Sequence, residues 1–206
     1  MLKIFTSYTP GAGKSYAMME EAMNESRNGK KVVIAFINKQ HRDSSKMPFE
    51  CNENVTIHPL KGRESIEEII EMKPDIVVLD ELGMRIGKHT FLYNVAESFI
   101  KNNISVLTAN LKRFEEVNPI FRSATGVGIK TTIPNRFIKG ADEIVFIDRE
   151  PELMIKDFKE GKLFGERYMN SRIMNKNFEE NTLKTYREIS LDYLEKYNNV
   201  RIIQRD

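Results

Sequence analysis

The stretch Leu2-Lys3-Ile4-Phe5-Thr6-Ser7-Tyr8-Thr9-Pro10-Gly11-Ala12-Gly13-Lys14-Ser15 carries the strongest signal in this 206-residue chain. Its first five residues predict a buried strand, and the residues from Lys14 to Asn28 have helical spacing before Gly29. Glycines between the two let successive backbone N–H groups point into one concavity, to which the helix amino terminus adds positive dipole. Lys14 would reach β- and γ-phosphates, and the Ser15 hydroxyl would hold Mg²⁺. The stretch therefore predicts a phosphate-binding loop.

The fit to the pattern Gly-x-x-x-x-Gly-Lys-Ser/Thr is incomplete, because Tyr8 stands where the first glycine belongs. The chain also has Thr9 where the loops of partition-type ATPases carry an extra lysine. A wider or differently bent entry to the loop would accommodate Tyr8. The alternative interpretation is a glycine-rich turn between strand and helix that binds nothing.

A second signal is the apolar run from Ile76 to Leu79, which is followed directly by Asp80 and Glu81. In a parallel sheet these two carboxylates would lie on the same edge as the loop. Asp80 would then bind Mg²⁺ through water and Ser15, because hard cations prefer oxygen ligands. Glu81 could orient or deprotonate an attacking water. Without the loop, the same pattern is more often a structural strand end.

Several other polar residues follow predicted strands. Thr108 and Asn110 stand where a residue that senses the γ-phosphate would lie, although such residues more often form a strand-end turn. A cation near the γ-phosphate would assist phosphoryl transfer. The arginines near predicted strand ends are Arg42, Arg85, Arg113 and Arg122, and each is more often a solvated surface residue.

Short apolar runs alternate with segments of helical period along most of the chain. The expected strands are Leu2–Thr6, Lys31–Ile37, Asp75–Asp80, Ile104–Ala109 and Glu143–Asp148; the expected helices are Lys14–Asn28, Ser65–Met72 with a Ser65–Glu68 capping box, Thr90–Asn102 and Leu111–Ala124. Asn54–His58 and Val127–Ile133 also look strand-like, with no clear place in the sheet. The alternation predicts a three-layer, doubly wound, mostly parallel α/β sheet of P-loop NTPase type.

The last forty residues have a different pattern. Apolar residues recur at helical spacing from Asn177 to Tyr197, which predicts an amphipathic helix packed on the domain or on a partner. We therefore expect a nucleotide-binding α/β domain over residues 1–165 and a helical carboxy-terminal extension over residues 166–206.

Composition excludes other classes of protein. A net charge of +2 argues against nucleic-acid binding driven by bulk charge. No stretch approaches the roughly 18 consecutive apolar residues of a membrane span, so we expect no membrane insertion. The single cysteine, Cys51, cannot form an internal disulfide, which fits a cytoplasmic location.

Segments beyond the loop give the chain a more specific resemblance. They are Pro10-Gly11-Ala12-Gly13-Lys14-Ser15-Tyr16-Ala17-Met18, Asp75 to Leu82, Asn110, Ala124-Thr125-Gly126-Val127, Ile133-Pro134-Asn135-Arg136, Ala141 to Asp148, Lys159-Glu160-Gly161-Lys162, and Asn177-Phe178 through Arg187-Glu188-Ile189. In this order they resemble the amino-terminal cytoplasmic domain of the potassium- and osmosensing histidine kinases of the KdpD family. The resemblance covers nearly the whole chain, and that family also tends to lack the first glycine of the loop.

The resemblance implies a domain that binds ATP and Mg²⁺ and that acts with a protein partner in two-component signalling. The expected nucleotide contacts are Pro10, Gly11, Ala12, Gly13, Lys14, Ser15, Tyr16, Asp80 and Asn110, with Ser15 and Asp80 holding the metal. A full sensor kinase would add membrane helices and a kinase domain, for which 206 residues leave no room. We expect no histidine kinase activity of the chain itself. It would be either a freestanding module or a fragment of a longer chain, and Met1 just before the first strand favours a natural start.

Three polar clusters differ from the family pattern. Gly83-Met84-Arg85-Ile86 replaces Ala-His-Thr-Asn, Asn110-Leu111-Lys112-Arg113 replaces Asn-Val-Gln-His, and Asn38-Lys39-Gln40-His41-Arg42 replaces Glu-Thr-His-Gly-Arg. We therefore expect this chain to share nucleotide binding with the family more readily than any particular signalling response. Two alternatives stay open. The first is a small P-loop NTPase or kinase with Glu81 as catalytic base, which includes a weak ATPase. The second is a protein-interaction module with a vestigial loop.

Overall fold

The computed structural model describes residues 1–37, 48, 52–87, 90–109, 111–126, 129, 131–164 and 172–206. Its strands are β1 (Leu2–Thr6), β2 (Val32–Phe36), β3 (Val55–Ile57), β4 (Ile76–Asp80), β5 (Arg85–Ile86), β6 (Thr90–Phe91), β7 (Ser105–Ala109), β8 (Glu143–Arg149) and β9 (Val200–Arg205). Its helices are α1 (Lys14–Arg27), α2 (Arg63–Glu71), α3 (Leu92–Lys101), α4 (Asn118–Thr125), α5 (Arg136–Lys139), α6 (Pro151–Lys159), α8 (Arg172–Asn177) and α9 (Glu180–Leu194).

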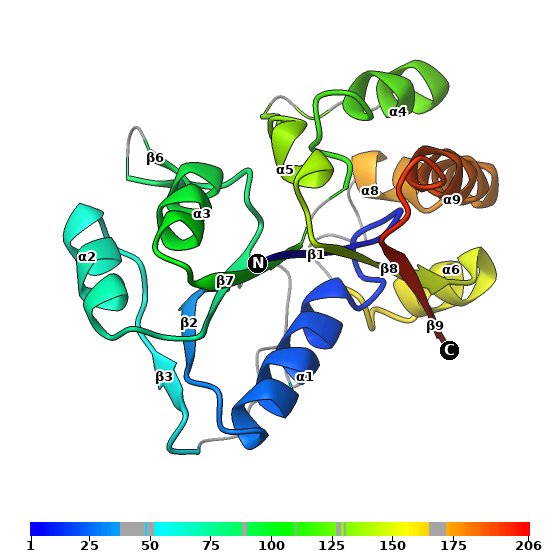
Figure 1. Ribbon diagram of the computed structural model, residues 1–206. Helices are drawn as coiled ribbons and strands as arrows, with labels where there is room; N and C mark the ends of the chain where they lie inside the picture. The colour runs from blue at the N-terminus through cyan, green and yellow to red at the C-terminus, as the bar shows by residue number, and fades with distance from the viewer. Residues whose placement is uncertain are drawn as a thin grey trace.

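Seven strands form one sheet in the order β3-β2-β4-β7-β1-β8-β9, and every neighbouring pair is parallel. The chain moves from β1 toward the β3 edge through α1, and then returns toward the β9 edge through α2, α3, α5 and α9. Crossovers between parallel strands are right-handed, so the direction of each move decides which face its helix covers. Figure 1 accordingly shows α1 on one side of the sheet and α3, α5 and α9 on the other.

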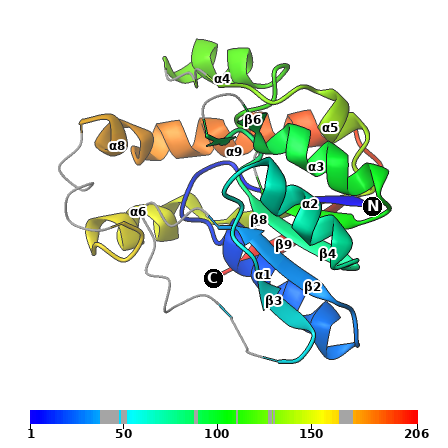
Figure 2. The same ribbon diagram turned by 90° about the vertical axis from the view of Figure 1, so that its left-hand side faces the viewer.

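Two apolar layers separate the sheet from its helices. On one face the methionines and alanines of α1 pack against Phe5, Val78 and Val145. On the opposite face α2, α3, α5 and α9 cover Ile4, Val77 and Phe146, in a larger core; Figure 2 shows these helices from the side. The predicted three-layer α/β fold with a mostly parallel sheet is confirmed, and its assignment to the P-loop type stays a prediction.

The predicted helix starts need correction at three places. Helix α2 begins at Arg63, and Ser65 lies in its first turn, where its Oγ accepts the Gly62 N–H at 3.2 Å. The predicted Ser65–Glu68 capping box is therefore wrong. Residues 90 and 91 form β6, which pairs with β5, so the third helix starts at Leu92. In the segment Leu111–Ala124 only α4 is helical, because Pro119 is tolerated only in the first helical turn.

The ends of the sheet also differ from the expectation. Asn54–His58 contains β3, an edge strand beside β2. In Val127–Ile133, residues 127, 128 and 130 lie outside the described residues, and Ile133 makes an isolated bridge to Phe114. The carboxy-terminal segment holds α8, α9 and β9, and β9 completes the sheet beside β8. The extension therefore adds a strand that its helical pattern did not predict. The proposed domain boundary after residue 165 stays a prediction.

Helix α9 turns its apolar face inward. Leu183, Tyr186, Tyr193 and Leu194 are buried in the same core as the sheet residues. Of the two predicted alternatives for this helix, packing on its own domain is the one observed. Within the described part of the chain, none of the helices combines the length and the apolar character needed to cross a bilayer.

Candidate functional site

The loop between β1 and α1 lies at the carboxyl end of a central strand. Gly11 and Gly13 have φ values of 89° and 97°, in the left-handed region that favours glycine. A Cβ atom on Gly11 would also lie 3.2 Å from Leu163 Cδ1. The backbone conformation therefore favours glycine at both positions, and at Gly11 the close packing of Leu163 is a second reason.

Lys14, Ser15 and Asp80 are brought together beside this loop. Lys14 Nζ donates to Ser7 Oγ and to the Thr9 carbonyl, at 3.1 Å in each case. Ser15 Oγ lies 3.0 Å from both carboxylate oxygens of Asp80, to which it donates. All three side chains are buried. Residues that are 65 positions apart in the sequence thus meet because β1 and β4 end at the same edge of the sheet.

These residues fit a polyphosphate with a magnesium ion. The Lys14 ammonium and the amino-terminal turn of α1 supply positive charge for the phosphates. The hydroxyls of Thr6 and Thr9 are also buried, and neither has a hydrogen-bond partner in the described residues. Orphaned buried hydroxyls are costly, and a ligand oxygen would satisfy them. The Ser15 hydroxyl and the Asp80 carboxylate are the oxygen ligands that Mg²⁺ prefers.

Tyr8 explains why the pattern lacks its first glycine. Its ring is fully buried in the core between the sheet and α9, and its Oη donates to the Arg149 carbonyl at 2.5 Å. Burial raises the pKa of Tyr8, and the nearby Asp148 raises it further. Tyr8 is not among the residues with positive φ. Its backbone has no need of glycine, and its side chain anchors the loop to β8.

Glu81, the predicted catalytic base, has a partner at the same edge. Its backbone is left-handed, with a φ of 69°, and its Oε2 lies 3.3 Å from Arg113 Nε. Arg113 also donates to the Thr131 carbonyl at 3.4 Å, and its Cδ packs against Gly83. Glu81 is therefore held in an ion pair, an arrangement that differs from a carboxylate poised over an attacking water.

The remaining sequence candidates are dispersed. Arg85 stacks on Phe91 with 4.3 Å between its Cζ and the ring centroid, and Arg122 is exposed on α4. Tyr16 is exposed on α1. Asn110 and Arg42 lie outside the described residues, as does the side chain of Thr108. Of the three candidate arginines that the structure describes, Arg113 is the one that pairs with Glu81.

Two cations that were not among the predicted contacts lie close to the loop. Lys112, just after β7, places its Nζ 3.1 Å from the centroid of the Tyr186 ring, and the Lys14 charge acts on it. Arg205, at the end of β9, approaches Gly13 and lies 5.1 Å from the Tyr16 ring centroid. The departure from the family pattern at Lys112 could have identified that residue from the sequence. Arg205 could not be found in this way, because it lies near the loop only when β9 joins the sheet.

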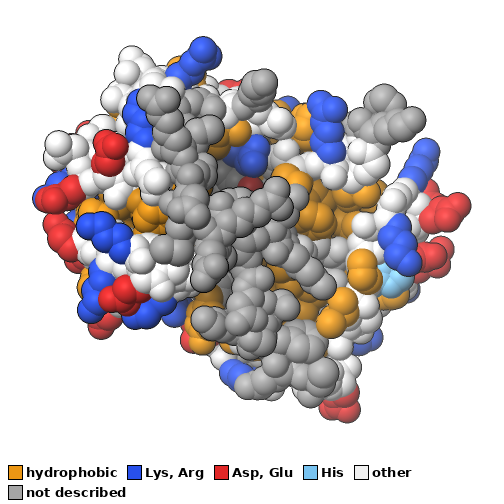
Figure 3. Space-filling view, turned by 180° about the vertical axis from the view of Figure 1, so that it is seen from behind, with side chains coloured by type: hydrophobic (Ala, Val, Ile, Leu, Met, Phe, Trp, Pro, Cys, Tyr) orange, Lys and Arg blue, Asp and Glu red, His pale blue; other side chains and the backbone are white. Residues whose placement is uncertain are grey.

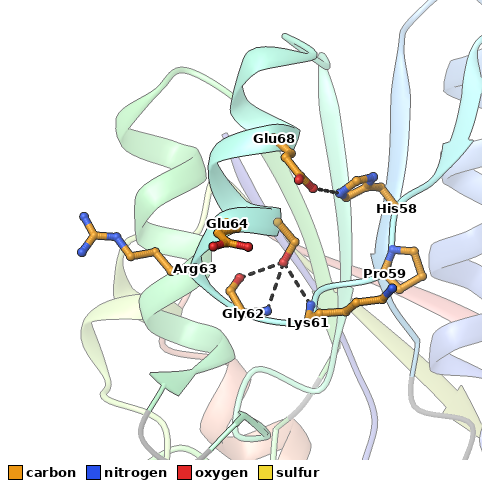
Figure 4. A pocket seen from close by; sticks show the side chains of 8 residues that line it. His58, Pro59, Lys61, Gly62, Arg63, Glu64 and Glu68 are labelled. Carbon is orange, nitrogen blue, oxygen red and sulfur yellow. Dashed lines mark hydrogen bonds and ion pairs between the residues drawn. The ribbon is translucent and has the colours of Figure 1, made fainter.

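A cavity of about 550 Å³ lies elsewhere, between the end of β3 and the start of α2 (Figure 4). Two of its basic side chains have acidic partners: His58 Nε2 lies 2.8 Å from Glu68 Oε2, and Arg63 pairs with Glu67. None of the predicted nucleotide contacts lines it. The face seen in Figure 3 mixes Lys and Arg with Asp and Glu around its rim, so its described part carries no broad field of one sign.

Comparisons with known proteins agree on one family. The model of the family described as KdpD, osmosensitive K⁺ channel His kinase sensor domain, matches residues 1–196. The chain is 30% identical over 200 residues to the sensor protein KdpD of Clostridium acetobutylicum, with 92% of this chain and 22% of that protein covered. It is 28% identical over 204 residues to the putative sensor protein KdpD of Synechocystis, with 92% and 54% covered. For the sensor protein KdpD of Escherichia coli the identity is 26% over 176 residues, with 79% and 19% covered. The chain therefore spans only part of the length of these relatives.

Proposed function

This chain belongs to the family of KdpD osmosensitive K⁺ channel His kinase sensor domains, and from that premise we propose that it is an ATP-binding sensor domain. In the proposal it holds ATP with Mg²⁺, acts in the cytoplasm, and changes its contacts with a protein partner in potassium or osmotic two-component signalling. The observation that carries the nucleotide part is the convergence of Lys14, Ser15 and Asp80 on one buried edge of the sheet.

Each residue of the loop has a defined part in this proposal. The backbone N–H groups from Gly11 to Ser15 bind phosphate oxygens, together with the positive end of the α1 dipole. Lys14 exchanges its present contacts with Ser7 and Thr9 for phosphate oxygens. Ser15 and Asp80 hold Mg²⁺, and the bound ion neutralises part of the phosphate charge.

A regulatory output is favoured over turnover by the state of Glu81. A base for hydrolysis must reach an attacking water, whereas the Glu81 carboxylate lies against the Arg113 guanidinium. Binding would then act by shifting populations between two conformations. To move the responsive state from about 1% to about 99%, the nucleotide must bind it about ten-thousand-fold more tightly than the other state.

Isothermal titration calorimetry tests the binding step. We expect the unchanged protein to bind ATP with Mg²⁺, and Lys14→Ala to weaken that binding by at least tenfold, since a charged hydrogen bond contributes about 1.5–3 kcal/mol. Lys101→Ala, at an exposed position of α3, is the matched control and should bind as the unchanged protein does. Equal binding by Lys14→Ala and Lys101→Ala would contradict the proposal.

Phosphate release separates regulation from catalysis. The regulatory proposal expects no release of phosphate from ATP and Mg²⁺ above the solvent background. Release that is faster than this background and is abolished in Glu81→Gln would instead identify a P-loop NTPase with Glu81 as its base.

A further inference from the structure

Lys112 lies where the strand order brings it beside the phosphate-binding loop. β7 is the parallel neighbour of β1, and Phe5 is in register with Ala109. The segment after β7 therefore leaves the sheet next to the segment that begins at Thr6. Lys112 is three residues beyond the end of β7, which lies on the side of β1 opposite β8.

The amine of Lys112 is held by aromatic rings. Its Nζ lies 3.1 Å from the ring centroid of Tyr186, on α9, and 5.3 Å from that of Phe121, on α4. The two rings pack edge to face, with centroids 5.4 Å apart. Contacts with aromatic faces stabilise a cation but supply no counter-charge. The rings thus fix the position of the amine without neutralising it.

In the part of the chain that the structure describes, no carboxylate forms an ion pair or hydrogen bond with the Nζ of Lys112. The charge that acts on it is the like charge of Lys14. Burial lowers the pKa of Lys112, and Lys14 lowers it further. Two amines whose like charges act on each other in a partly dry site favour an anion that reaches both.

We propose that Lys112 binds the outermost phosphate of a nucleoside triphosphate whose inner phosphates lie on the loop from Gly11 to Ser15. The inference rests on the proposed function and specifies the nucleotide that the site prefers. Lys14 starts α1 and reaches the phosphates from the loop, whereas Lys112 comes from the neighbouring strand. A diphosphate that occupies the loop ends before it reaches Lys112, so the lysine discriminates triphosphate from diphosphate.

Calorimetric titration of ATP and of ADP, each with Mg²⁺, tests this discrimination in Lys112→Met. Methionine keeps the length of the side chain and packs well between aromatic rings, so the variant should retain the fold, which circular dichroism checks. We expect its affinity for ATP to fall about ten- to a hundredfold and its affinity for ADP to change less than about threefold, as for a lost charged hydrogen bond. Lys112→Arg should keep the preference for ATP, and Lys101→Met controls for the loss of a lysine.

Each result has a definite meaning. Equal losses of ATP and ADP affinity in Lys112→Met, or no loss of either, would overturn the proposed role of Lys112. The proposal that the domain binds ATP would still stand. Failure of the unchanged protein to bind ATP overturns the proposed function as well, which distinguishes the two failures. Should Lys112→Met unfold, Lys112→Gln keeps a polar side chain without the charge, and the same loss of ATP preference is expected.

Discussion

An ion pair between Arg187 and Asp148 joins the carboxy-terminal helix α9 to strand β8 of the sheet. Asp148, near the end of β8, has a side chain that is 3% exposed. Arg187 on α9 donates to its two oxygens at 2.8 and 2.7 Å, and Gln204 on β9 donates at 3.0 Å. Hydrogen bonding to Asp148 raises the pKa of Arg187 above its ordinary value, so the guanidinium stays charged.

Arg187→Leu removes the charge that compensates a buried carboxylate. Breaking a buried ion pair in this way costs about 3–5 kcal/mol. The Arg187 side chain is 25% exposed, so water can solvate part of the site, and we expect the lower end of that range, about 3 kcal/mol. For a chain of this length each kcal/mol lowers the melting temperature by about 2–4 °C. The variant should therefore melt about 6–12 °C below the unchanged protein.

Thermal unfolding followed by circular dichroism measures this shift. The double variant Asp148→Asn with Arg187→Leu should recover at least half of the lost melting temperature, because no charge is then left buried without a partner. Arg63→Leu, in an exposed pair on α2, serves as the control and should melt as the unchanged protein does. A shift below about 2 °C in Arg187→Leu, or a double variant that is less stable than the single one, would refute this reasoning.

Three other perturbations have defined outcomes. Tyr8→Gly would complete the glycine pattern of the loop, but it should cost about 4 kcal/mol in urea unfolding, because it empties a buried aromatic site. Burial by itself would raise the pKa of Glu143, but hydrogen bonds from Lys3 and Arg201 outweigh this and lower it from 4.5. The stabilisation that Glu143 contributes is therefore present above pH 4.5 and is lost as the pH falls through the lowered pKa. Glu143→Gln should accordingly destabilise the protein at pH 7, and by progressively less as the pH is lowered below 4.5. Removal of β9 by truncation after Asn199 bares the edge of β8, and size-exclusion chromatography should then show self-association.

Local sequence patterns were sufficient for the central part of the molecule. The strands β1, β2, β4, β7 and β8 are apolar runs that are buried on both faces, and such runs predict a parallel sheet wherever they alternate with helices. The loop was equally readable, because Gly11 and Gly13 occupy left-handed conformations that few other residues adopt. Helix starts were less accurate, because Ser65 resembles a cap but lies within the first turn.

Electrostatic partners could not be predicted from the sequence. Glu81 was interpreted as a catalytic base from its place after a strand, and the structure pairs it with Arg113, 32 positions away. Lys112 was visible as a departure from the family pattern, but its aromatic neighbour Tyr186 comes from a helix more than seventy residues later. Such pairs depend on which elements the fold brings together, and no spacing within one segment encodes them.

The sequence by itself determined the alternation of strands and helices, the loop with its two required glycines, and the family to which the chain is similar. These properties depend on local backbone preference and on short apolar periods, which a linear pattern records. Tertiary structure decided that Tyr8 anchors the loop, that β9 closes the sheet beside β8, and that Arg187 joins α9 to Asp148. It also decided which cations face the loop. Burial and charge are properties of the assembled layers, since residues far apart in the sequence share one edge only after the sheet has formed.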